Sequence, residues 1–100
     1  MVLQNLNIRG KAMIKWKLKR AIKRIKRMEA CFDALTSAAE KDPSSVDKKQ
    51  LRTLTDYYDG GKWRQDFELD ERGYLPPDLK RGVLSEDGVY NLLAVLAEAE

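Results

Sequence analysis

The feature that most constrains the fold of this chain is an apolar seam in its first half. Eight apolar residues follow one another at spacings of 4, 3, 4, 3, 4, 3 and 4, namely Ile14, Leu18, Ala21, Ile25, Met28, Phe32, Leu35 and Ala39. This spacing places all of them on one face of an α-helix. No glycine or proline stands between Lys11 and Asp42. We therefore predict one helix from about Lys11 to Glu40, about 45 Å long at 1.5 Å per residue, whose first turns project beyond a small core.

Turn residues divide the rest of the chain into shorter helices. A proline at position 43 ends the first helix, because the residue before a proline avoids the helical conformation. Either Ser44 or Ser45 is placed to cap a second helix, which runs to about Asp59 and stops at a glycine pair. A third helix is predicted from Lys62 to Glu71. Since the first connection is short, we expect the second helix to lie antiparallel to the first.

The last helix has the best-marked start in the chain. Ser85 is its predicted N-cap, Leu84 and Val89 form a hydrophobic staple, and its apolar stripe continues through Leu92, Leu93 and Leu96. The segment from Gly73 to Leu84 contains two prolines and is expected to wrap the bundle irregularly. The predicted fold class is therefore all-α: a small helical bundle with a long N-terminal helix, an antiparallel second helix, a short third helix and a C-terminal helix joined by an irregular Gly/Pro-containing segment.

The chain is predicted to form a single domain. Residues 1–10 show no clear periodicity and are interpreted as a mobile leader, followed by one helical domain over residues 11–100. Within that domain, residues 11–23 are expected to form a basic helical extension that projects. Met13 is a second candidate for the start of translation, so the sequence leaves open whether residues 1–12 belong to the protein.

Composition argues against several classes of function. The chain has no histidine and one cysteine, which removes the commonest general base and leaves too few ligands for structural zinc. We therefore expect no enzyme activity, no cofactor, no bound metal and no small-molecule substrate. A lone cysteine allows no internal disulfide, and we find no secretory signal and no apolar run of ~20 residues. A cytoplasmic location is the expectation.

Charge is distributed unevenly along the chain. Residues 1–28 contain ten Lys or Arg and no acid, whereas residues 29–100 contain the other nine bases and all sixteen acids, so +10 and −7 give the net +3. The bases of the first helix lie opposite the apolar seam, with a tryptophan among them. The residues predicted to contact an anion or a nucleic acid are Lys11, Lys15, Trp16, Lys19, Arg20, Lys23, Arg24 and Arg27.

This basic face has several interpretations. Phosphates of a nucleic acid would neutralise the bases, and Trp16 would stack on an unpaired base. An acidic protein surface would satisfy the same charges, and an anionic membrane surface is less favoured. A solvated helix face that carries one exposed tryptophan requires no partner at all.

Two further groups of residues are interpreted as structural. An acidic run alternates in the manner of a calcium loop and consists of Asp66, Glu68, Asp70 and Glu71. The glycine and glutamate that an EF-hand needs at its sixth and twelfth positions are absent, so we interpret the run as a solvated face or a dock for basic residues of the same fold. Cys31 has acidic as well as basic neighbours in sequence and is expected to be an ordinary, partly buried thiol.

The predicted core joins the seam to the aromatic residues of the second half. Aromatic side chains bury ~150–250 Å² each and are more often core than ligand site. The predicted structural core consists of Ile25, Met28, Phe32, Leu35, Leu54, Tyr58, Trp63, Phe67, Leu75, Leu79, Leu84, Tyr90 and Leu93.

Three blocks of the sequence resemble one family. They are Arg24–Glu29 with Phe32-Asp33, Leu54–Tyr58 with Trp63, and Asp70-Glu71 with Gly73, Leu75-Pro76, Asp78–Asp87, Tyr90 and Leu92-Leu93. Together they cover residues 24–96 and resemble the bacterial domain of unknown function 4298 family, of which the last block is the most distinctive part. The resemblance implies a small, all-helical, cytoplasmic bacterial protein, and it implies no activity and no site residues. The chain departs from the family in its basic extension over residues 1–20 and in ending soon after Leu93.

Two functions follow as hypotheses. The first is a non-enzymatic helical module that binds a protein partner, with self-association as one form of it, because a seam of nearly four heptads is longer than one short helix can cover. The alternative is a small nucleic-acid-binding protein that uses the basic face of the first helix. Salt separates the two, since nucleic-acid binding weakens steeply with salt and a hydrophobic seam does not.

Overall fold

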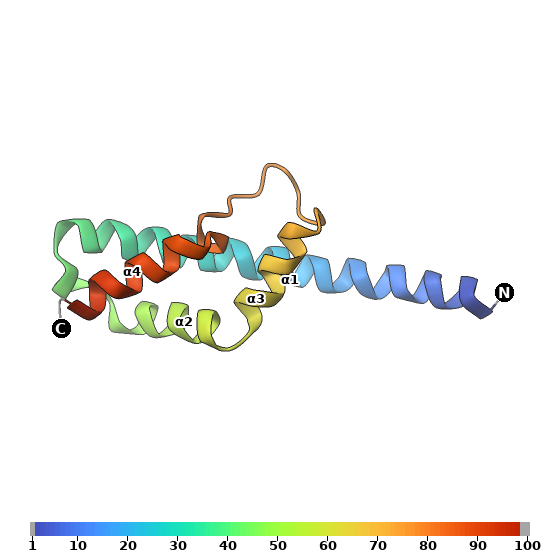
Figure 1. The fold of residues 1–100 in the computed structure, drawn as a ribbon, viewed down its shortest axis with the longest axis horizontal. Helices are drawn as coiled ribbons and strands as arrows, with labels where there is room; N and C mark the ends of the chain where they lie inside the picture. Colours follow the sequence, from blue (N-terminus) through green and yellow to red (C-terminus); the bar gives the residue numbers. More distant parts are fainter. Residues whose placement is uncertain (1, 99–100) are drawn as a thin grey trace.

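The structure is a computed structural model that describes the backbone of residues 2–98 and the side chains of residues 15–98. Over those residues it is all-α, without a β-strand, as predicted. The molecule is elongated, with extents of 60 × 25 × 19 Å. One long helix runs its whole length, and the other elements gather on the C-terminal half of that helix (Figure 1).

Helix α1 spans Val2–Lys41 and is longer than predicted. It begins at Val2 rather than at Lys11, so residues 2–10 belong to the helix. The predicted boundary between a leader and a domain, after residue 10, therefore falls inside the helix. The mobility of the leader stays a prediction, and Met1 lies outside the described residues. The helix ends before Asp42, whose extended backbone precedes the proline as expected.

The connection after α1 corrects the predicted cap. Asp42 caps a short 3₁₀ helix, η1 (Pro43–Ser45), by accepting a hydrogen bond from the Ser44 N–H at 3.1 Å. Helix α2 (Lys48–Asp59) is capped by Asp47, whose carboxylate accepts from the Lys49 N–H at 2.8 Å. The two serines are therefore used in the 3₁₀ turn and not as the N-cap of α2. Helix α2 returns antiparallel to α1 (Figure 1), as predicted.

Helix α3 (Lys62–Glu71) has the predicted bounds. It crosses α1 steeply at the middle of the molecule (Figure 1). Gly73 ends it with φ of 76°, and the Tyr74 N–H reaches back to the Leu69 carbonyl at 3.1 Å, a glycine-dependent C-terminal cap. The chain then runs irregularly to a second 3₁₀ helix, η2 (Gly82–Leu84).

Arg81 fixes the irregular segment. Its guanidinium donates to Asp70 Oδ1 at 2.9 Å and to the carbonyls of Pro76 and Leu79 at 2.9 and 3.1 Å. Helix α4 (Glu86–Glu98) follows, and Ser85 Oγ accepts from its Gly88 N–H at 3.3 Å, as the predicted N-cap requires.

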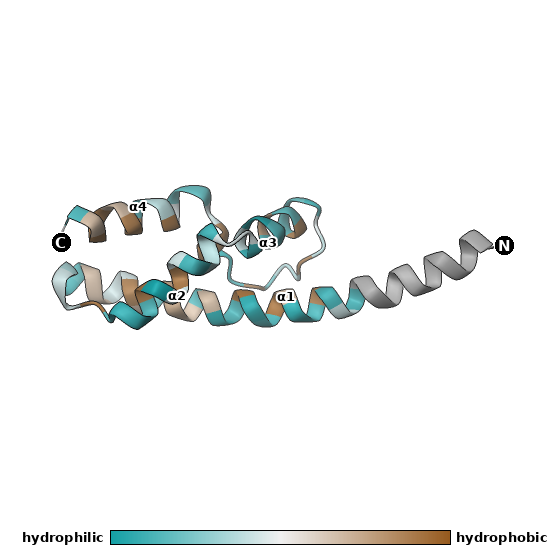
Figure 2. Cartoon of the chain, turned by 90° about the horizontal axis from the view of Figure 1, so that it is seen from below, coloured by the Kyte–Doolittle hydropathy of each residue, from teal (hydrophilic) through white to brown (hydrophobic). Residues whose placement is uncertain are grey.

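The core lies where α2, α4, η1 and η2 pack against the seam of α1, with α3 packed on α2 and η2. The packed helices carry hydrophobic segments, coloured brown in Figure 2, and α1, α2, α3, α4 and η2 all contribute buried apolar residues. Of the predicted core, the buried members are Ile25, Met28, Leu35, Leu54, Trp63, Leu75, Leu79 and Leu84, and the partly buried members packed against them are Phe32, Tyr58, Phe67 and Leu93.

The prediction that Tyr90 belongs to the core is wrong, because its side chain is 64% exposed. The buried stripe of α4 consists of Val89, Leu92 and Leu96, and a residue next to Val89 points about 100° away from it. On α2 the fully packed tyrosine is Tyr57 rather than Tyr58. The predicted list also omits Val46 and Val83, which are buried.

Candidate anion-binding groove

The site begins with the basic face of α1. Lys17, Arg20 and Arg24 are spaced at i, i+3 and i+7 and therefore share one side of the helix. Alone they would form a stripe in open water. Helix α3 crosses α1 at this level and supplies a second wall.

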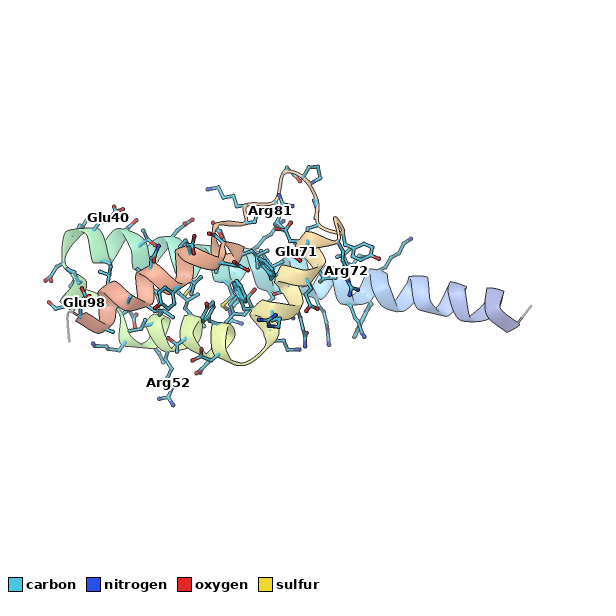
Figure 3. The ribbon with its side chains drawn as sticks, in the orientation of Figure 1. Glu40, Arg52, Glu71, Arg72, Arg81 and Glu98 are labelled. Atoms are coloured by element: carbon cyan, nitrogen blue, oxygen red, sulfur yellow. The ribbon has the colours of Figure 1, made fainter. Side chains whose placement is uncertain are left out.

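A groove of about 550 Å³ separates the two helices. It is lined by Lys17, Arg20, Arg24, Lys62, Gln65, Glu68, Leu69 and Arg72. Five of these eight residues are bases and one is an acid. Arg72 lies at the end of α3, beside α1 (Figure 3). Three arginines and two lysines line this one hollow. They suit an anionic group such as phosphate, which arginine can bind with two parallel hydrogen bonds.

A buried carboxylate holds the two walls together. Asp66 of α3 is fully buried, and it accepts hydrogen bonds from the Arg24 guanidinium, at 2.9 Å from Nε, and from the Tyr57 hydroxyl at 2.7 Å. The hydrogen bond from Arg24 to Asp66 raises the pKa of the guanidinium. Burial, helped by the bond to Asp66, raises the pKa of the Tyr57 phenol. Both donors stay protonated near neutral pH, so the position of α3 on α1 is fixed by charge as well as by packing.

The prediction for Arg24 therefore needs correction. Its guanidinium is committed to Asp66 and only a quarter of its side chain remains exposed. It shapes the groove, while Lys17, Arg20, Lys62 and Arg72 supply the charges available to a ligand.

Trp16 stands at the edge of this surface. Its side chain is 61% exposed, and the Arg20 guanidinium lies 4.2 Å from the centre of its ring system. This cation–π contact holds the indole against the helix. Arg20 thus touches the tryptophan and lines the groove.

The other residues of α1 that were predicted to contact an anion do not line the groove. Lys15, Lys19 and Lys23 are exposed on α1 and do not line it. Arg27 lines a different hollow, of about 360 Å³, with Cys31 and residues of α2. The side chain of Lys11 lies outside the described residues.

A third hollow lacks the excess of basic residues that an anion would need. It holds about 450 Å³ between α1 and the irregular segment, and its charged residues are Lys26, Glu29, Asp33, Asp78 and Lys80. Three acids against two bases do not favour an anion there. The α1–α3 groove is therefore the candidate site.

Two carboxylates of the acidic run bind basic side chains of the same fold, which was one of the two interpretations of the run. Asp66 holds Arg24, and Asp70 accepts from Arg81 at 2.9 Å, while Glu68 and Glu71 are exposed. Among the described residues, no three of the Cys, Asp and Glu side chains are grouped so as to hold a metal. Within the same part of the chain, none of the helices has the length and apolar character to cross a membrane.

Cys31 is partly buried, as predicted. Its thiol lies 3.3 Å from the Gln50 carbonyl, and burial raises the pKa of the thiol. A raised pKa keeps the sulfur as the less reactive thiol near neutral pH.

Sequence reasoning missed Lys62 and Arg72. They sit at the two ends of α3, ten positions apart, and no local pattern connects them with α1. The available signal was the position of Asp66 between Trp63 and Phe67 in the third helix, since a carboxylate buried among apolar residues needs a basic partner. That partner sets which bases of α1 face α3.

Comparison with known proteins places the chain in a family. A model of the family described as Domain of unknown function (DUF4298) matches residues 25–99. No curated protein and no solved structure matched the chain. The matched range contains the α3 wall of the groove, whereas Lys17, Arg20 and Arg24 precede it.

Proposed function

Because the chain belongs to the family described as Domain of unknown function (DUF4298), whose description carries no activity, we propose a function from its own surface: it binds nucleic acid through the α1–α3 groove and catalyses no reaction. The observation that carries this proposal is the meeting of bases from two helices around one hollow of about 550 Å³. A nucleic-acid backbone presents a row of phosphates, and such a row matches charges spread along a groove better than a single small anion does.

Four of the five bases that line the groove are free to bind phosphate, since only Arg24 is paired with Asp66. Within residues 15–98, no carboxylate forms a salt bridge with Lys17, Arg20, Lys62 or Arg72. All four side chains are exposed. Each phosphate that they neutralise releases condensed counterions, which is the main source of sequence-independent affinity.

Protein interaction becomes the second candidate. The hypothesis rested on an uncovered seam, but Ala21, Ile25, Met28 and Leu35 are buried within one chain. The feature that still favours a protein partner is the part of α1 that extends beyond α3, away from the other helices (Figure 1). Sedimentation over a wide range of protein concentrations tests self-association, and a monomer throughout would remove it.

The test of nucleic-acid binding compares two variants of equal charge. In Lys62→Gln/Arg72→Gln the groove loses its α3 bases. In the control, Lys49→Gln/Arg52→Gln, two exposed bases are removed from α2, and Arg52 points away from the groove (Figure 3). Fluorescence anisotropy of labelled single- and double-stranded oligonucleotides then reports affinity at about 50 and about 200 mM salt.

Four phosphate contacts give a salt slope of about −2.8 on a single strand, at about 0.7 per contact, so a fourfold rise in salt weakens binding about 50-fold. The groove variant should retain a slope of about −1.4 and weaken only about 7-fold, whereas the control should behave as wild type. Equal losses in the two variants would show that net charge, and not the groove, governs binding. No binding by wild type at low salt would end the proposal.

A further inference from the structure

Trp16 is the feature that the phosphate contacts leave unexplained. Among the side chains of residues 15–41, the part of α1 whose side chains are described, it is the large apolar one left exposed, at 61% of its surface. The other tryptophan, Trp63, is buried, donates its indole N–H to the Val83 carbonyl at 2.8 Å and stacks on Phe67. Of the two indoles, Trp16 alone offers a ring face to a ligand.

The register of α1 joins this ring to the groove. Arg20 lies one turn after Trp16, about 6 Å further along the axis, with its guanidinium 4.2 Å from the indole. The same arginine lines the groove together with Lys17. A ligand that rests on the open ring face therefore has its neighbouring charges within reach of the groove bases.

From this juxtaposition we propose that the protein takes single-stranded nucleic acid, with an unpaired base stacked on Trp16 and the adjoining phosphates held in the α1–α3 groove. The inference rests on the nucleic-acid function proposed above. An exposed aromatic ring beside a basic groove is the combination by which single strands are held without sequence preference. In a duplex the faces of the bases are already stacked on one another, so the indole gains a partner only where a base is extruded.

The chemistry also separates this ligand from other polyanions. An acidic peptide offers carboxylates to the groove but no flat ring for Trp16. The stacked nucleobase therefore distinguishes a single strand from an acidic peptide, and the phosphates supply the negative charge that the groove binds. Removing the indole should weaken single-strand binding and leave duplex binding as it was.

The experiment uses the full chain and three variants. Trp16→Leu removes the ring face and keeps an apolar side chain, Trp16→Phe restores a smaller ring, and Tyr90→Leu removes an aromatic side chain that is 64% exposed on α4. Anisotropy measures the affinity for a labelled single strand, for its duplex and for polyglutamate of similar length. Tryptophan emission is followed in the same titrations, with buried Trp63 as a constant background.

We expect Trp16→Leu to bind the single strand at least about 5-fold more weakly, the lower bound of one base–aromatic stack. Trp16→Phe should recover most of that loss, Tyr90→Leu should lose nothing, and the single strand should quench Trp16 emission. Duplex affinity should be the same in all four proteins.

Three results overturn the inference in distinguishable ways. If no oligonucleotide binds, the nucleic-acid function fails and the stacking proposal fails with it. If oligonucleotides bind and Lys62→Gln/Arg72→Gln weakens them but Trp16→Leu does not, the groove function stands and stacking is refuted. If polyglutamate binds as tightly as the single strand, the groove is a dock for acidic protein and the single-strand assignment is wrong.

Discussion

Replacing Asp66 by asparagine tests whether one buried carboxylate holds α3 against α1. Asp66 has no exposed surface and accepts hydrogen bonds from the guanidinium of Arg24 and the hydroxyl of Tyr57. Asparagine has nearly the same shape. However, it carries no charge, and its NH₂ group must face a donor in either orientation, because Arg24 donates to both oxygens of Asp66. The substitution therefore removes the attraction and leaves the packing nearly unchanged.

The size of the loss follows from the burial of the two partners. Breaking a buried ion pair by changing one member costs about 3–5 kcal/mol. The Arg24 side chain is 25% exposed and can regain water, so we expect the lower end, about 3 kcal/mol. For a chain of this size each kcal/mol lowers Tm by about 4–8 °C, which gives a decrease of about 12–24 °C.

Urea unfolding followed by circular dichroism measures this difference. Glu68→Gln is the matched control, since it removes a carboxylate from an exposed position of the same helix and should stay within about 0.5 kcal/mol of wild type. Because Arg24→Met breaks the same pair, the double variant Arg24→Met/Asp66→Asn should lose about 1–3 kcal/mol less than the sum of the single variants. Additive losses, or an Asp66→Asn variant as stable as the control, would refute the reasoning.

Three further predictions concern other buried groups. Burial and the bond to Asp66 raise the pKa of the Tyr57 phenol, so its contribution to stability is complete below pH ~10, the unfolded value. Above that pH the contribution is lost by about 1.4 kcal/mol per pH unit, a slope that urea unfolding of Tyr57→Phe should lack. Gly82→Ala would place a methyl group 2.8 Å from Glu29 Oε1, and displacing that carboxylate from its buried hydrogen bond should cost about 1–3 kcal/mol, measured as a lower urea midpoint. Burial raises the pKa of the Cys31 thiol, so iodoacetamide should alkylate it more slowly than a cysteine peptide at neutral pH, and equal rates would contradict the packing seen here.

Local signals in the sequence predicted the elements of the fold well. The seam predicted α1, the glycines at 60, 61 and 73 marked the ends of α2 and α3, and Ser85 marked the start of α4. Each of these signals lies within a few residues of the feature that it determines. The predicted N-cap of α2 was wrong because Ser44, Ser45 and Asp47 can all cap a helix. The 3₁₀ turn that begins at Pro43 includes both serines and leaves Asp47 as the cap.

The groove was only half predicted. The bases of α1 form a pattern within one helix, whereas Lys62 and Arg72 join them through the crossing of α3 over α1. At that crossing Arg24 pairs with Asp66, and the two residues are 42 positions apart in the sequence. Similarly, Tyr57 and Tyr58 both fit the apolar stripe of α2, and the hydroxyl bond to Asp66 distinguishes the buried one.

Because α1 is continuous, the pairing of Arg24 with Asp66 also fixes the direction in which Lys17 and Arg20 point around the helix axis. Each residue of an α-helix adds about 100° of rotation. One residue inserted between Arg20 and Arg24 would leave Arg24 at Asp66 but swing Lys17 and Arg20 about 100° around the axis, away from α3. Seven inserted residues would restore the direction to within about 20° but displace both bases by about 10 Å. In this segment, evolution can therefore exchange side chains far more freely than it can add or delete residues.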